Sequence, residues 1–359
     1  MCGIVGYIGK GETTDILLNG LRRLEYRGYD SAGVALADKN GLKVFKKKGR
    51  VDELAQELGR HKLNPTSGIA HTRWATHGEP SEKNSHPHVS GSFAVVHNGI
   101  IENYRELKAH LQKQGVKFVS DTDTEVLAHL INQEYQKQPD LVQAVTSALK
   151  HVIGSFGLGV VSSKEPGKVI AARRGSPLLL GVGDGEMFIA SDAAAIIGHT
   201  NQVVYLEDDE VALCTADSYK ISTLENLERE RQAETINLKL EMIEKGGYDH
   251  FLIKEIMEQP QTLQNLLSGK FDEKHNTIRP GGINLTPEQA RGVERLLVIG
   301  CGTAYYAGLI GKYLLERLTG IPVDVEFASE FRYRDPVLSP GTTGVIISQS
   351  GETADTLAS

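Results

Sequence analysis

The chain has 359 residues, of which 40% are hydrophobic and 24% charged, and its formal net charge at pH 7 is −7. The length favours two domains, the composition is typical of a packed globular protein, and the negative charge disfavours nucleic acid as a partner. The apolar runs are far shorter than the roughly twenty residues of a membrane-spanning helix, and the first residues lack the pattern of a secretory signal. We therefore expect a cytoplasmic protein that binds neither membrane nor nucleic acid.

Short strands alternate with helices over the first 220 residues. Apolar and alternating runs predict strands over 3–8, 32–37, 68–71, 93–97, 157–161, 169–173, 187–191 and 211–214. Helical spacing predicts helices over 14–23, 104–114, 124–136 and 141–152. This mixture predicts a layered α+β domain in which helices cover the outer faces of a sheet.

A charged segment, residues 224–247, follows this region. It is poor in strand pattern and ends in Gly246 and Gly247, which is typical of an interdomain linker. We place the boundary near residue 240, so that residues 1–240 form the first domain and residues 241–359 contain the linker and the second domain.

The second domain begins with a predicted helix over 248–268. Apolar runs then predict buried parallel strands over 296–300, 323–327 and 344–348, with a helix over 304–318 between the first two. This order predicts an α/β sheet that binds ligands at the carboxyl ends of its strands. The pattern stops before the roughly four to six strands of a common sheet, so we expect an incomplete domain.

The cysteines of the chain are Cys2, Cys214 and Cys301, and they form no CxxC pair, which disfavours both a disulfide framework and a zinc site. Removal of Met1 would expose the thiol and the α-amine of Cys2 together. An α-amine titrates at about pH 7.7–8, so it can accept the thiol proton, and the thiolate can attack an amide. The alternative is that Cys2 is a small buried hydrophobe at the start of a strand.

Residues 71–78 concentrate two imidazoles, a guanidinium, an indole and a hydroxyl in one loop after a predicted strand. Arg73 can hold a substrate carboxylate in a bidentate fork, and Trp74 can close over a small ligand. For His71 or His77 taken singly, a structural role is the stronger interpretation. The loop is therefore a candidate substrate site.

Asn98 and Gly99 lie between two apolar runs, which is the strongest local signal for a tight hairpin. The same turn can aim the Asn98 amide and the Gly99 N–H at a developing oxyanion. The sequence does not separate these two uses.

Thr122 and Glu125 have the spacing of a capping box at the start of a predicted helix. Asp123 lies between them and has no part in that motif. Its carboxylate can pair with a substrate α-ammonium while Arg73 holds the α-carboxylate, or it can interact with the helix dipole. Both interpretations stay open.

Two loops of the second domain each join a strand to a helix. Residues 300–305 partly match the dinucleotide-binding GxGxxG pattern, with Tyr305 in place of the third glycine, and residues 348–353 carry three hydroxyls. Backbone N–H groups at a helix start favour phosphate, so the two loops predict a site for a phosphorylated small molecule. Ordinary Ser/Thr capping is the alternative.

Five segments together closely resemble the glutamine:fructose-6-phosphate amidotransferase (isomerising) family, the glucosamine-6-phosphate synthases: Met1 to Gly6, Tyr26 to Gly33, His71 to Gly78, His97 to Gly99 and Asp121 to Glu125. The resemblance spans the whole chain. It implies an N-terminal-nucleophile (αββα) glutaminase domain followed by a truncated sugar isomerase (SIS) domain with a parallel sheet. It also implies an amino-sugar enzyme that needs no cofactor or metal and is a homodimer when complete.

The resemblance further implies that Cys2 hydrolyses glutamine to glutamate and ammonia, which the complete enzyme transfers to fructose 6-phosphate to form glucosamine 6-phosphate. It assigns the oxyanion hole to Asn98 and Gly99, and glutamine binding to Arg73, Trp74, Thr76, His77, Gly99 and Asp123. Sugar-phosphate contacts are implied for Thr303, Ser348, Gln349, Ser350 and Thr353. The family usually has a serine where this chain has Ala304. Its isomerase residues would follow Ser359, so we expect this chain alone to support glutaminase activity only.

Three alternatives remain open from the sequence. The same glutaminase can be coupled to another acceptor, as in amidophosphoribosyltransferase or asparagine synthase. The C-terminal part can be a sugar-phosphate sensor that only regulates. A dinucleotide site is the third alternative, because Glu326 follows the first loop at about the twenty-residue distance of a ribose-binding acid.

Overall fold

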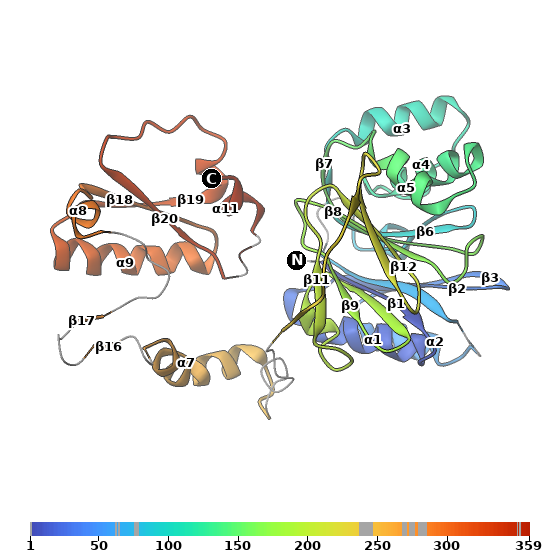
Figure 1. The fold of residues 1–359 in the computed structure, drawn as a ribbon, viewed down its shortest axis with the longest axis horizontal. Coiled ribbons are helices and arrows are strands. Elements are labelled where there is room, and N and C mark those ends of the chain that lie inside the picture. Colours follow the sequence, from blue (N-terminus) through green and yellow to red (C-terminus); the bar gives the residue numbers. More distant parts are fainter. Residues whose placement is uncertain are drawn as a thin grey trace. The chain divides into compact units, whose positions relative to one another are not determined.

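The computed structural model describes residues 2–61, 63, 65–74, 79–236, 247–267, 271–272, 277–278, 286–349, 351 and 353–359. The chain divides into two compact units, Met1–Phe251 and Leu252–Ser359 (Figure 1).

The first unit contains two antiparallel sheets. One has the strand order β15-β11-β9-β10-β1-β4-β2-β3, formed by β1 (Gly3–Gly9), β2 (Ser31–Asp38), β3 (Gly41–Lys48), β4 (Ser67–Arg73), β9 (Leu179–Val182), β10 (Glu186–Ala190), β11 (Gln202–Tyr205) and β15 (Glu234–Thr235). The other has the order β14-β13-β12-β8-β7-β6-β5, formed by β5 (His88–Ser90), β6 (Phe93–Ile101), β7 (Gly154–Ser162), β8 (Val169–Arg174), β12 (Glu210–Cys214), β13 (Tyr219–Thr223) and β14 (Glu228–Arg229).

Alternation along β1 shows how the layers form. Ile4 and Ile8 belong to an apolar cluster that also includes residues of β6, β7 and β8, so they face the other sheet. Val5 and Tyr7 point the opposite way, into a cluster with residues of α1 (Thr13–Leu24) and α2 (Val51–Leu58). Strand residues alternate between the two faces of a sheet, so both faces of β1 are buried.

Helices also cover the outer face of the second sheet. The helices α3 (Tyr104–Lys113), α4 (Glu125–Lys137) and α5 (Leu141–Leu149) share a buried cluster with β6, β7 and β8. Figure 1 shows these helices on one side of the paired sheets and α1 and α2 on the other. The unit is therefore an αββα sandwich, as the sequence predicted, and the predicted strands and helices of this region are confirmed.

Three local expectations were wrong. Asn98 and Gly99 form no hairpin, because β6 runs on through both residues and pairs them with Gly157 and Phe156 of β7. Residues 224–236 are not a strand-poor linker, because β14 and β15 add edge strands to the two sheets. The predicted capping box does not form either, because α4 begins at Glu125.

The second unit contains a parallel sheet with the order β19-β18-β20, formed by β18 (Arg295–Gly300), β19 (Val323–Phe327) and β20 (Thr342–Ile347). Its other elements are α7 (Phe251–Leu267), β16 (Phe271–Asp272), β17 (Thr277–Ile278), α8 (Pro287–Arg291), α9 (Thr303–Thr319), α10 (Ala328–Phe331) and α11 (Ala354–Ala358). The parallel strand–helix–strand arrangement confirms the sequence prediction.

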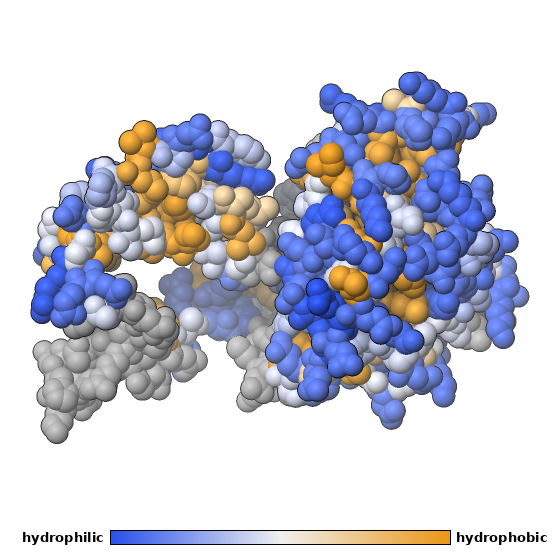
Figure 2. All heavy atoms as spheres, turned by 45° about the horizontal axis from the view of Figure 1, so that its top comes forward, coloured by the Kyte–Doolittle hydropathy of each residue, from blue (hydrophilic) through white to orange (hydrophobic). Residues whose placement is uncertain are grey.

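Gly308 lets α9 approach the parallel sheet closely. A Cβ atom at this position would lie 2.9 Å from Val298 and 3.0 Å from Val325. Leu297 and Ile299 face the opposite side of the sheet, in a cluster with α10. Figure 2 shows a mainly hydrophilic surface on the first unit and apolar side chains gathered on one face of the second. Within the described part of the chain, the helices are too short or too polar to span a bilayer.

Candidate active site

The start of the chain meets the end of β4 at the predicted nucleophile. Strands β1 and β4 are antiparallel neighbours, with Gly3 opposite Thr72, so Cys2 lies beside the residues that end β4. The backbone N–H of Trp74 donates a hydrogen bond to Cys2 Sγ at 3.2 Å. Residues more than seventy positions apart are thus brought to one end of the first sheet.

The Cys2 thiol is partly exposed and lies in a poorly solvated position. Burial raises its pKa above the ordinary value, although the Trp74 N–H and the positive charge of Arg73 act in the opposite direction. Desolvation disfavours the thiolate because the charged form loses hydration. The thiol is therefore protonated at rest and needs a nearby base to become a nucleophile.

Asn98 reaches Cys2 from the other sheet. Its Nδ2 donates to the backbone carbonyl of Cys2 at 3.1 Å, and its Oδ1 lies 3.0 Å from Nε2 of His71. Gly99 follows with φ +128°, and a Cβ atom there would lie 2.2 Å from the Ser155 carbonyl oxygen. Only glycine fits this backbone position. Pairing with β7 holds Asn98 and Gly99 in the last part of β6.

Arg73 and Asp123 place opposite charges in the interior near this end of the sandwich. Their side chains are almost fully buried, with exposed fractions of 4% and 6%. Asp123 Oδ2 accepts a hydrogen bond from the Ile101 N–H at 2.8 Å, two residues beyond Gly99 in β6. A buried guanidinium and a buried carboxylate are suited to the two charged ends of an amino acid.

Glu125 explains why the predicted capping box is absent. Its carboxylate accepts hydrogen bonds from the backbone N–H groups of Val119 and Ser120, at 2.8 and 2.7 Å. Burial alone would raise the pKa of Glu125, but hydrogen bonds from His129, Ser120 and the two N–H groups outweigh it and lower the pKa to about 2. The acid fixes the loop before α4, which carries Asp123.

Trp74 is 54% exposed, and its ring packs against Gly28. A Cβ atom on Gly28 would lie 2.0 Å from carbon atoms of the indole. Only glycine at position 28 therefore leaves room for the Trp74 ring. Two other predicted glutamine contacts, Thr76 and His77, lie outside the described residues.

Four histidines are buried behind these residues: His71, His86, His88 and His97. Burial lowers the pKa of each one, to about 3 for His71. The sequence treated His71 as structural and gave no reason to group it with the others. Across the described parts of the chain, no group of His, Cys, Asp and Glu has the geometry of a metal site.

The two loops of the second unit lie at one edge of the parallel sheet. Gly300 of β18 is in register with Ile347 of β20, so the segments that follow these strands are neighbours. Thr303 is exposed at the start of α9, and the Gly351 N–H donates to Ser348 Oγ at 3.0 Å. Gln349 and Thr353 also lie in the second loop, whereas Ser350 lies outside the described residues.

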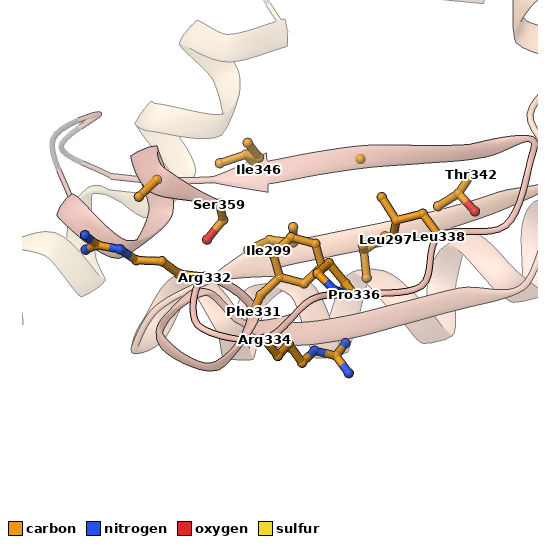
Figure 3. Close-up of a pocket in the computed structure, with 12 residues that line it drawn as sticks. Leu297, Ile299, Phe331, Arg332, Arg334, Pro336, Leu338, Thr342, Ile346 and Ser359 are labelled. Atoms are coloured by element: carbon orange, nitrogen blue, oxygen red, sulfur yellow. The ribbon is translucent and has the colours of Figure 1, made fainter.

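A groove of about 440 Å³ on the sheet face does not contain these hydroxyls (Figure 3). Apolar side chains such as Leu297, Ile299 and Ile346 line much of it. The guanidinium of Arg332 pairs with Asp355, and that of Arg334 pairs with Glu326. The groove is therefore not the predicted phosphate site, and the acid required by the dinucleotide alternative is already engaged by an arginine.

Comparison with known proteins agrees with this architecture. Residues 71–198 match the glutamine amidotransferase domain family, and residues 291–359 match the SIS domain family. The chain is 52% identical over its full length to a glutamine–fructose-6-phosphate aminotransferase (isomerizing) of Chlorobaculum tepidum, and 50% identical over 99% of its length to one of Thermus thermophilus. It spans 59% and 58% of these two relatives.

A solved structure shares the fold. The glutamine phosphoribosylpyrophosphate amidotransferase from B. subtilis, complexed with ADP and GMP, aligns with 90% of this chain and 65% of its own, with a TM-score of 0.56 and 22% identity. The first unit is thus an N-terminal-nucleophile glutamine amidotransferase domain with antiparallel sheets, and the second is part of an SIS domain with a parallel sheet.

Proposed function

We propose that this chain, which is homologous over its whole length to glutamine–fructose-6-phosphate aminotransferases, hydrolyses glutamine through Cys2. The observation that carries the proposal is the contact set of this residue: its sulfur accepts the Trp74 N–H, and its backbone carbonyl accepts the Asn98 amide. The thiol therefore lies between a candidate substrate loop from one sheet and a candidate oxyanion donor from the other.

The α-amine of Cys2, free once Met1 is removed, is the base in this proposal. It takes the thiol proton, and the thiolate attacks the side-chain carbonyl carbon of glutamine. Asn98 Nδ2 and the Gly99 N–H donate to the resulting oxyanion. The α-ammonium then gives its proton to the leaving nitrogen, ammonia departs, and a γ-glutamyl thioester remains. Water attacks this thioester, glutamate leaves, and the thiol is restored.

Substrate binding follows from the buried charges. Arg73 holds the α-carboxylate of glutamine and Asp123 holds its α-ammonium, because each is a desolvated group of opposite sign. Trp74 closes over the bound amino acid. Thr76 and His77 complete this set in our proposal.

In the complete enzyme we assign the ammonia to fructose 6-phosphate, which gives glucosamine 6-phosphate. Support comes from the SIS match and from the two loops that share one sheet edge. Thr303, Ser348, Gln349, Ser350 and Thr353 are the proposed contacts of the sugar phosphate. The domain assignment of 1–240 and 241–359, the homodimer and the cytoplasmic location also remain predictions.

Replacement of single cysteines tests the proposal. We expect Cys2→Ala to abolish glutamate release from glutamine, because it removes the nucleophile and keeps the size of a small side chain. Cys301→Ala is the matched control, since this partly exposed thiol lies in the second unit. Glutaminase activity that survives Cys2→Ala, or that depends on Cys301, would rule the proposal out.

A further inference from the structure

His86 and His97 hydrogen-bond to Thr124, and His71 packs beside His86 and contacts Asn98. His97 Nδ1 lies 2.8 Å and His86 Nε2 lies 3.0 Å from Thr124 Oγ1. The rings of His71 and His86 pack with centroids 4.2 Å apart. Thr124 thus forms hydrogen bonds with two of the imidazoles, and the third, His71, contacts Asn98, the candidate oxyanion donor.

The surrounding acceptors fix where the protons of this cluster lie. His97 Nε2 is 3.2 Å from the Ser155 carbonyl oxygen, which only accepts, so Nε2 carries the proton of the neutral ring. His97 Nδ1 is then an acceptor, and Thr124 Oγ–H donates to it. The alternative acceptor of that hydroxyl, Asp123 Oδ1, is farther away at 3.4 Å. Since a hydroxyl has one proton, Thr124 accepts from Nε2–H of His86.

The same reasoning places the proton of His71. Its Nε2 faces two oxygens, the carbonyl of His97 at 3.1 Å and Oδ1 of Asn98 at 3.0 Å. A carbonyl oxygen cannot donate, so His71 carries its proton on Nε2 and donates to this pair. Its Nδ1 has no hydrogen-bond partner, which is tolerable for the acceptor nitrogen of a neutral ring and costly for an N–H.

We propose that His71 is a positioning residue that fixes the side-chain amide of Asn98 with its oxygen toward Nε2–H and its NH2 group toward Cys2. This inference rests on the proposed glutaminase function. Turning the amide over would place the NH2 group against the imidazole N–H, where it has no acceptor, and would set the amide oxygen against the Cys2 carbonyl oxygen, which cannot donate. Asn98 would then present an oxygen to the developing oxyanion.

His71 cannot serve as a proton carrier at working pH. Burial lowers its pKa to about 3, and the hydrogen bond to Asn98 only partly offsets this effect. The ring is neutral and keeps one tautomer. Its contribution is therefore orientation, which is expected to appear in kcat and not in KM, because the charged ends of glutamine contact Arg73 and Asp123.

Kinetics of full-chain variants test the proposal. Loss of an oxyanion donor costs about 100-fold to 1,000-fold in kcat, so we expect His71→Leu to lower kcat by tens of fold to about 100-fold with KM changed less than about threefold. His71→Gln keeps an N–H donor and should recover a large part of the loss. In the Asn98→Ala background, His71→Leu should cause no further loss.

His88→Leu is the matched control. His88 is equally buried, but its Nε2 contacts Thr122 Oγ1 at 3.0 Å and not Asn98. It should lose stability and keep kcat per folded molecule within about threefold of the starting protein. Equal loss in His71→Leu and His88→Leu, or additive loss with Asn98→Ala, would overturn the proposal.

Nitrogen-15 NMR of the histidines gives a readout that needs no variant and no activity. We expect the Nε2–H tautomer for His71, without titration between pH 5.5 and 8.5. An Nδ1–H tautomer, or a titrating ring, would refute the positioning role even where His71→Leu does not fold. A starting protein that shows no Cys2-dependent glutaminase activity would instead contradict the proposed function.

Discussion

Moderate acid should destabilise the first unit, because this unit keeps several imidazoles neutral in its interior. His71, His86 and His88 are buried and have strongly lowered pKa values because of desolvation. In the unfolded chain each ring titrates near 6.5. Below about pH 6.5 the unfolded chain therefore binds protons that the folded chain excludes, so the free energy of unfolding falls as the pH falls toward about 3.

The size of the effect follows from proton linkage. Each neutral ring whose folded pKa lies far below pH 5.5 lowers the free energy of unfolding by about 1.4 kcal/mol between pH 7.5 and 5.5. His71, with a folded pKa of about 3, therefore contributes about 1.4 kcal/mol, and His86 and His88 act in the same direction, against the roughly 5–15 kcal/mol of an ordinary domain. Glu125 does not contribute here, because its pKa of about 2 places its own loss of stability below about pH 4.5.

Urea titrations at the two pH values measure this difference. Trp74 is the one tryptophan of the chain and lies in the first unit, so its fluorescence reports on that unit. His88→Gln should reduce the pH dependence, whereas His110→Gln, at an exposed helical position, should leave it unchanged. A change of less than about 1 kcal/mol between pH 7.5 and 5.5 would refute the reasoning.

Three further substitutions test single contacts. Gly99→Ala should abolish glutaminase activity and lower the free energy of unfolding by several kcal/mol, because its Cβ would meet the Ser155 carbonyl oxygen at 2.2 Å. The control is Gly115→Ala, which has open space around it and φ +86°. It should lower the free energy of unfolding by only about 1 kcal/mol in the same urea titration. Asp123→Asn keeps an acceptor for the strand but loses the charge, so KM for glutamine should rise at least tenfold with a smaller change in kcat, and an unchanged KM would contradict the assignment. Glu125→Ala should lower the free energy of unfolding by about 2–3 kcal/mol, since two backbone N–H groups lose their acceptor. A loss below about 0.5 kcal/mol, which is the effect of an ordinary surface substitution, would argue against that contact.

The sequence predicted the layers of the first unit because local patterning reflects burial there. In β1, both faces are buried, and the apolar run from Gly3 to Ile8 reports this directly. The edge strands β14 and β15 were missed, since their residues are exposed and charged and carry no apolar alternation. Edge strands that lack apolar alternation were therefore not visible in the sequence, and the short inner strands β9 and β11 were not predicted either.

Local signals failed where long-range pairing opposed them. Asn98 and Gly99 have the sequence of a tight turn, yet β7 pairs with β6 along its full length and keeps both residues in the strand. The Thr122 and Glu125 spacing fits a capping box, yet the carboxylate binds the preceding loop. In both cases tertiary contacts override a pattern that is defined over only a few residues.

The histidine cluster was out of reach for a different reason. His71 lies on β4 of one sheet, and His88 and His97 lie on β5 and β6 of the other. Nothing in their spacing shows that the two sheets bring them together. Residues that act through packed neighbours become visible only when the fold is known, whereas Cys2 is a candidate nucleophile from its place in the chain alone.

The thioester on Cys2 is the most direct test of the whole account. Full-chain protein mixed with glutamine and quenched in acid within one turnover should yield, by peptide mass spectrometry, a γ-glutamyl adduct on the peptide that begins at Cys2 with a free α-amine. An adduct on another residue, or an active enzyme that keeps Met1, would contradict the proposed nucleophile and its base.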